Sequence, residues 1–197
     1  MKKLANVFFA TGARRAKSSA GSYARKPRSL RLESLENREL LTATQWTVDS
    51  VLDVVDPDDG YTTLREAAMN SAAGDVVVFD VALAGKTIEL NSQIQISHSL
   101  TIDATETQIT IDAGETGRAL YVNNASTSLD LVGLTFTGGN VGASGGAIYF
   151  VGRELSVSNC VFEGNLASPN GGAIYCESVK AEIYDSTFSG NSAGAEG

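Results

Sequence analysis

The stretch from Phe136 to Asn191, FTGGNVGASGGAIYFVGRELSVSNCVFEGNLASPNGGAIYCESVKAEIYDSTFSGN, decides the fold because it repeats itself. Three motifs recur in the same order at spacings of 25 or 26 residues: Phe at 136, 162 and 188, Asn at 140, 165 and 191, and GGAIY at 145–149 and 171–175. A diverged earlier copy is visible in Ile94-Gln95-Ile96, which lies 26 residues before Leu120-Tyr121-Val122. Internal repeats of this length are typical of solenoids.

The apolar residues of each unit alternate with polar ones in runs of three to five, such as Leu129/Leu131 and Leu155/Val157. Alternation with period two predicts strands, and Gly, Asn, Ser and Thr between the runs predict turns. Because like residues lie one unit apart, stacked units bring Phe onto Phe and Asn onto Asn. The sequence therefore predicts an all-β, right-handed, single-stranded parallel β-helix, with about four coils over residues 91–197.

The recurring residues then have structural roles. We expect the three Phe to point inward as an aromatic ladder and the three Asn to lie at a tight corner in a left-handed conformation, hydrogen-bonding from coil to coil. Paired glycines let the chain bend sharply before Ala147 and Ala173. Tyr149 and Tyr175 alternate with inward isoleucines, so they are expected to face outward.

The pairing of GGAI with Phe-x-x-Asn, as in Phe162-Glu-Gly-Asn165 and Phe188-Ser-Gly-Asn191, resembles the repeat of chlamydial polymorphic outer-membrane proteins. The first copy departs from it by one extra residue, in Phe136-Thr-Gly-Gly-Asn140. The resemblance implies a passenger-like structural or adhesive solenoid that is extracellular, on the cell surface or in the outer membrane.

Residues 44–90 have a different pattern. Residues 63–72 predict one short helix, with Thr63 as N-cap and Glu66 completing a capping box. With Gly74, Asp75 and Phe79, the segment resembles the CSLREA-type module that begins many bacterial β-helices, although Thr63 stands in place of its Cys. A helix laid across the first coil would cap the solenoid and protect its open edge.

The first 43 residues carry ten Lys and Arg against three Glu, a net charge of +7, whereas the rest of the chain has a net charge of −15. This asymmetry predicts a separable, disordered or processed tail. Residues 31–43, RLESLENRELLTA, resemble the LEPRxLL-type leader of planctomycete exported proteins, with Glu36-Asn37 in place of the usual Pro. The resemblance implies export, with cleavage near Ala43.

Few residues suggest chemistry. Cys160 and Cys176 are either two small core residues or a disulfide in an oxidising compartment. His98 has no nucleophile motif and no second His near it, so we expect a surface residue in a turn. No catalytic, cofactor-binding or metal-binding residue is assigned.

The alternative to a non-catalytic solenoid is a pectin-lyase-like β-helix that binds or cleaves polysaccharides, with a groove that extends beyond residue 197. Such enzymes need clustered carboxylates, and four Asp are candidates: Asp103, Asp112, Asp130 and Asp185. These Asp do not recur one coil apart in the sequence, and Asp at a strand end usually forms a turn. Calcium held by loop carboxylates is a further alternative, and outward Tyr149 and Tyr175 could stack on surface glycans.

The acidic main part excludes nucleic acid as the expected partner, and no apolar stretch is long enough for a transmembrane helix. Partners are therefore expected among surface glycans or other cell-surface proteins. The sequence stops where a further GGAIY would follow, so end-to-end self-stacking is a further expectation.

Overall fold

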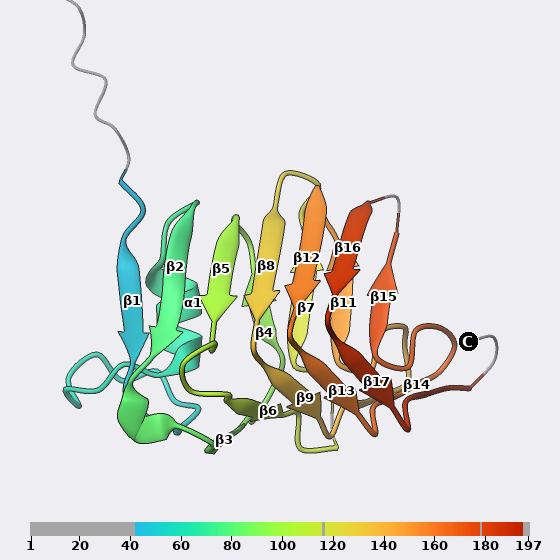
Figure 1. Ribbon diagram of the computed structural model, residues 1–197, viewed down its shortest axis with the longest axis horizontal. Helices are drawn as coiled ribbons and strands as arrows, with labels where there is room; N and C mark the ends of the chain where they lie inside the picture. Colours follow the sequence, from blue (N-terminus) through green and yellow to red (C-terminus); the bar gives the residue numbers. More distant parts are fainter. Residues whose placement is uncertain (1–41, 116, 178, 195–197) are drawn as a thin grey trace, which may run out of the picture. The chain divides into compact units, whose positions relative to one another are not determined.

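The computed structural model describes residues 42–115, 117–177 and 179–194 of the 197-residue chain. Of the expected leader, residues 1–43, all but the last two residues lie outside the described part of the chain. Within them the chain forms a parallel β-solenoid of about four turns, as the repeats predict. Figure 1 shows the strands of one sheet side by side, in sequence order from β1 to β16.

Four parallel sheets make up the solenoid, and each is named here for use below. The long sheet contains β1 (Gln45–Val48), β2 (Asp75–Phe79), β5 (Leu100–Asp103), β8 (Ser128–Val132), β12 (Glu154–Ser158) and β16 (Lys180–Tyr184). The phenylalanine sheet contains β3 (Thr87–Glu89), β6 (Thr110–Asp112), β9 (Thr135–Thr137), β13 (Val161–Glu163) and β17 (Thr187–Ser189). The short sheet contains β10 (Asn140–Val141), β14 (Leu166–Ala167) and β18 (Ser192–Ala193), and the tyrosine sheet β4 (Ile94–Ile96), β7 (Leu120–Asn123), β11 (Ile148–Val151) and β15 (Ile174–Cys176).

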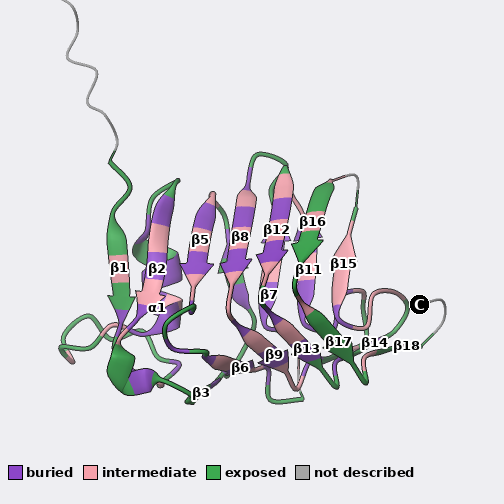
Figure 2. Cartoon of the chain, in the orientation of Figure 1, coloured by how far each residue is buried: buried purple, intermediate pink, exposed green. Residues whose placement is uncertain are grey.

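The predicted phenylalanine ladder is confirmed. Phe136 and Phe162 are fully buried, with ring centroids 5.1 Å apart, and Phe162 stacks on Phe188 at 4.8 Å. Phe188 is 44% exposed because it belongs to the last coil described, where no further described coil covers it. Figure 2 shows the same change along the solenoid, from buried central strands to exposed β16 and β17.

The asparagine column differs from the prediction in its first member. Asn140 pairs with Leu166, so Gly139 and not Asn140 stands one coil before Asn165 and two before Asn191. The buried Asn165 amide accepts from Gly139 N at 3.0 Å, and its Nδ2 donates to Phe136 O at 3.0 Å and to Asn191 Oδ1 at 2.9 Å. The extra glycine after Phe136 shifted the spacing and caused the wrong assignment.

The left-handed residue of this corner is also not the asparagine. It is the preceding glycine, with φ of +66° at Gly138, +66° at Gly164 and +63° at Gly190. Glycine adopts this conformation without a Cβ penalty, so the asparagine keeps ordinary backbone dihedral angles. Its side chain then makes the hydrogen bonds of the corner. At the GGAIY corner the coils approach closely, since a Cβ on Gly146 would collide with the carbonyl oxygen of Gly172.

The N-terminal segment caps the solenoid as predicted, and it also contributes strands. Helix α1 (Leu64–Asn70) has Thr63 as N-cap with the full capping box to Glu66, and it buries Leu64, Ala67 and Ala68. Strands β1 and β2 continue the long sheet in parallel with β5, and the short 3-10 helix η1 (Val81–Leu83) leads on to β3. The cap and the first coil therefore share one hydrophobic core.

Candidate functional site

The outward face of the tyrosine sheet carries a second aromatic column. Tyr121, Tyr149 and Tyr175 lie in register on β7, β11 and β15, and we call them the tyrosine ladder. Their ring centroids are 5.1 and 5.3 Å apart, with interplanar angles of 16° and 20°. Tyr121 and Tyr149 are half-buried between buried neighbours, and Tyr175 continues their column in register, which confirms that the ladder faces outward.

This stacking restricts what the ladder can bind. Facing rings cover one another, so the ring faces between Tyr121 and Tyr175 are not available for a sugar. The expected stacking of sugars on Tyr149 therefore does not fit, because both of its faces contact a neighbouring ring. Ring edges and hydroxyl groups remain for outward contacts, as in the 3.2 Å hydrogen bond from Tyr175 Oη to Glu177 Oε2. This bond raises the pKa of the Tyr175 hydroxyl.

A guanidinium group accompanies the ladder. Arg118 Cζ lies 5.4 Å from the Tyr121 centroid and 5.3 Å from the Tyr149 centroid. Its side chain is only 7% exposed, and its buried Nε has no hydrogen-bond partner. Desolvation lowers its pKa from the ordinary value, and the two tyrosines oppose that shift. A desolvated cation beside aromatic rings is stabilised by cation–π attraction.

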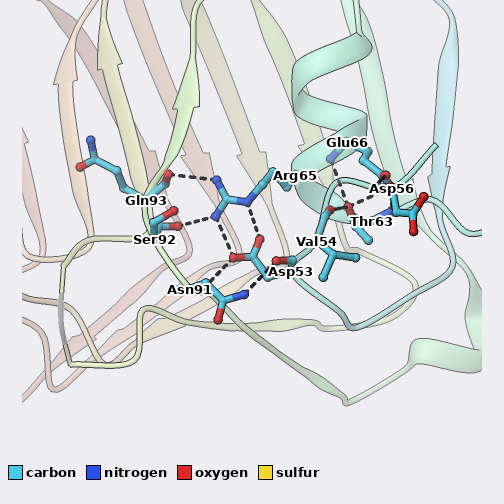
Figure 3. Close-up of polar contacts among 9 residues, drawn as sticks. All are labelled: Asp53, Val54, Asp56, Thr63, Arg65, Glu66, Asn91, Ser92 and Gln93. Carbon is cyan, nitrogen blue, oxygen red and sulfur yellow. Dashed lines mark hydrogen bonds and ion pairs between the residues drawn. The ribbon is translucent and has the colours of Figure 1, made fainter. Parts of the chain in front are cut away.

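The densest polar network lies elsewhere, between the cap and the first coil (Figure 3). Arg65 makes a bidentate pair with Asp53, at 2.7 and 2.8 Å, and donates to the carbonyls of Ser92 and Gln93 at 2.6 and 3.2 Å. Asn91 N also donates to Asp53, at 2.6 Å. Four of the five guanidinium N–H groups of Arg65 thereby bond to acceptors of the chain itself, so this network fastens the cap to the first coil.

Two carboxylates of the cap have lowered pKa values. Glu66 accepts from Thr63 N, which is the largest cause, and also from Asp56 N at 2.7 Å. Asp75 accepts first from Ala72 N, then from Thr44 N, and from the indole of Trp46 at 3.0 Å. Hydrogen bonds to the charged form favour ionisation, so both groups stabilise the cap as anions.

The four predicted aspartates are not brought together as a catalytic cluster. Asp103 and Asp112 accept from the backbone N of Thr105 and Gly114 at 2.8 and 2.9 Å, as turn formers do. Asp185 occupies a left-handed corner with φ of 47°, and Asp130 lies outward on β8.

One carboxylate pair was not predicted from the sequence, because it joins the candidate Asp112 to a glutamate, Glu89, that was not a candidate. Glu89 lies beside Asp112 in the register of β3 and β6, and both line an open groove of about 690 Å³. Glu115 lines the same groove, whereas no Lys, Arg or His is among its described lining residues. The groove is thus acidic.

Both cysteines are free, so the disulfide alternative is wrong. Cys160 is buried in the core, and Cys176 takes the inward position of Phe150 one coil later. Burial raises the pKa of both thiols, that of Cys176 to about 11, which makes them weak nucleophiles.

His98 is half-buried and is not the free surface residue expected. Its Nε2 lies 2.9 Å from the hydroxyl of Ser71, which ends helix α1. Ser71 is itself buried, so the pair joins the helix end to the first coil. The two residues are 27 positions apart, and no motif could have linked them.

The described part of the chain shows neither a metal-binding cluster nor a membrane-spanning helix. No group of three or more His, Cys, Asp or Glu there could hold a metal ion. No helix among the same residues is long and apolar enough to cross a membrane.

Comparison with known proteins gives one match, which falls on the segment that contains β13, β14 and β15. The Chlamydia polymorphic membrane protein repeat matches residues 159–177, which contain Phe162, Asn165 and the second GGAIY. No curated protein and no solved structure matches the chain. The matched repeat, folded as part of a parallel β-solenoid, indicates a surface-associated or outer-membrane-type protein.

Proposed function

We propose that this chain is an exported cell-surface module that acts by adhesion, without a catalytic site of its own, and that residues 1–43 serve as its export leader. The tyrosine sheet is its contact face. Most repeated residues are explained by folding alone. The Phe ladder fills the core, the Asn column makes the hydrogen bonds of a corner, and the glycines permit close approach of the backbones of successive coils.

The outward tyrosine ladder is the observation that carries this proposal. The matching outward positions of the long sheet change from coil to coil, as Thr101, Asp130, Ser156 and Glu182. On the tyrosine sheet the same aromatic residue returns in three successive coils although it does not fill the core. Tyrosine is enriched in binding surfaces, because its rigid ring and hydroxyl supply contact area at a small entropic cost.

Two measurements test the proposal. Protease treatment of intact producing cells should remove the chain from the outer surface, while a cytoplasmic marker survives. Beads coated with the purified full chain should adhere to cell surfaces, and replacing all three ladder tyrosines with Ser should abolish adhesion. A matched control replaces Ser156 and Glu182, on the opposite sheet, with Ala. Adhesion that is unchanged by the tyrosine replacements contradicts the proposal.

A second candidate function, polysaccharide cleavage, is favoured by the acidic groove. Glu89 and Asp112 lie on neighbouring strands, a separation that suits paired carboxylates in glycoside hydrolysis. The absence of a cation among the described lining residues argues against a lyase base. Release of reducing or unsaturated ends from polysaccharides by the full chain, lost in Asp112→Asn, would favour this function over adhesion. End-to-end self-stacking stays a prediction that a measurement of solution mass tests.

A further inference from the structure

Arg118 stands where the repeat has glycine. Gly117-Arg118-Ala119-Leu120-Tyr121 aligns with both GGAIY blocks, since Leu120 pairs with Ile148 and Ile148 with Ile174. In the two later coils the second position of the block is Gly146 or Gly172. The two later corners are therefore built without a side chain at this position, and the arginine departs from the repeat.

The arginine is also incompletely satisfied. Its Nε is buried without a hydrogen-bond partner, and no carboxylate among the described residues forms an ion pair with it. The aromatic rings attract the charge, but they accept no strong hydrogen bond. A guanidinium group carries five donors in a planar fork that matches a carboxylate or sulfate group. Buried charges are normally paired, and this one has no described partner within the chain.

The position of the guanidinium relates it to the ladder. The Tyr121 and Tyr149 centroids are 5.1 Å apart, and Cζ is nearly equidistant from them, at 5.4 and 5.3 Å. The guanidinium carbon is therefore as close to one ring as to the other. A ligand group at Arg118 would be next to this pair of stacked tyrosines.

The surroundings indicate what kind of ligand carries the anion. Gln95 and Asn123 are exposed on outward positions of β4 and β7 and add amide groups to the same face. None of the large exposed hydrophobic residues in the described chain belongs to the tyrosine sheet. A strip of amides and phenol hydroxyls suits a strongly hydrated ligand such as a sugar better than an apolar protein surface.

We infer that Arg118, with Tyr121 and Tyr149, forms an anion site that takes the carboxylate or sulfate group of an anionic glycan lying against the tyrosine sheet. This inference rests on the proposed adhesive function and names the ligand of its contact face. The guanidinium donates to the anionic group, and the neighbouring hydroxyls and amides bond to the sugar hydroxyls.

The test follows the Nε–H signal of Arg118 by NMR in the full chain at about 0.15 M salt, where charges beyond roughly 8 Å are screened. The Arg118→Lys variant assigns the signal by its disappearance. Three probes are titrated: alginate, which carries carboxylates, dextran sulfate, and uncharged dextran. We expect a saturable shift with alginate or dextran sulfate and none with dextran. The responding polymer identifies the anionic group.

Affinity measurements use matched variants, because the ten basic residues of the first 43 are expected to attract polyanions by themselves. Arg118→Gly restores the residue of the repeat and should weaken binding by about 10- to 100-fold, the loss expected for charge-assisted hydrogen bonds. Arg153→Gly removes an exposed charge from a turn and should leave affinity unchanged. Arg118→Lys keeps charge and fold but loses the planar fork, so it should also bind weakly.

An unmoved Arg118 signal, or equal affinities for Arg118→Gly and Arg153→Gly, overturns the inference. This failure is distinguishable from failure of the proposed function. If bead adhesion still depends on the tyrosines, the adhesive function stands and only the anion site is wrong. If the Arg118 signal responds but coated beads do not adhere, the site stands and the adhesive function is wrong.

Discussion

Replacing Phe162 with Ala tests the stacking of the coils quantitatively. Phe162 is fully buried, with ring centroids 5.1 Å from Phe136 and 4.8 Å from Phe188. Emptying such a site costs about 3–5 kcal/mol, and each aromatic pair contributes about 0.5–1.5 kcal/mol beyond area burial. Because Phe162 is stacked on both sides, we expect a loss of about 4–5 kcal/mol in the free energy of unfolding.

Phe188 is the matched control within the same ladder. It is 44% exposed and stacks on one described neighbour, so Phe188→Ala should cost roughly half as much, about 2 kcal/mol. Urea unfolding followed by circular dichroism measures both variants against the parent chain. A loss below about 1 kcal/mol for Phe162→Ala, or equal losses for the two variants, would refute the ladder.

Three further predictions follow from the polar and thiol groups. Asn165→Asp should destabilise the chain by about 2–4 kcal/mol, since a carboxylate cannot donate to the Phe136 carbonyl; an unchanged urea midpoint would contradict the buried column. The carboxyl groups of Glu66 and Asp75 have lowered pKa values, so they stabilise the cap fully above their unfolded pKa values, near pH 4, and this stabilisation is lost as the pH falls through their folded pKa values. Fluorescence of the single tryptophan should therefore report opening of the cap below about pH 4, before the far-ultraviolet circular dichroism changes. Simultaneous loss of both signals would contradict this order. Cys176, with a pKa of about 11, should react slowly with a thiol reagent at pH 8 and Cys160 more slowly still, with both rates rising sharply in urea; rapid labelling of either in the folded chain would show that the core is open there.

The sequence was sufficient for features that recur at a constant spacing. Phe136, Phe162 and Phe188 were placed correctly because inward residues of stacked coils must face one another. Asn140 was misplaced, because the inserted Gly139 changes the local spacing while the strand register does not follow the motif. Periodicity therefore predicts inward residues well and corners less well.

Features that do not repeat were not predictable from one sequence. The sequence did place Leu120-Tyr121-Val122 one unit before Ile148-Tyr149-Phe150, but Arg118 in the corner before it belongs to no repeated motif. Two contacts depend on how the cap packs on the first coil: the ion pair between Arg65 and Asp53, and the hydrogen bond between Ser71 and His98. No periodic signal determines these contacts.

The central claim, that successive coils stack in parallel and in register, is tested most directly by spin labels at positions 156 and 182. These residues are 26 positions apart and directly paired between β12 and β16 on the outward face. Adjacent strands lie about 4.8 Å apart, so the doubly labelled chain should show strong dipolar broadening in its continuous-wave spectrum compared with the two singly labelled chains. A spectrum equal to the sum of the single labels would contradict the parallel β-solenoid.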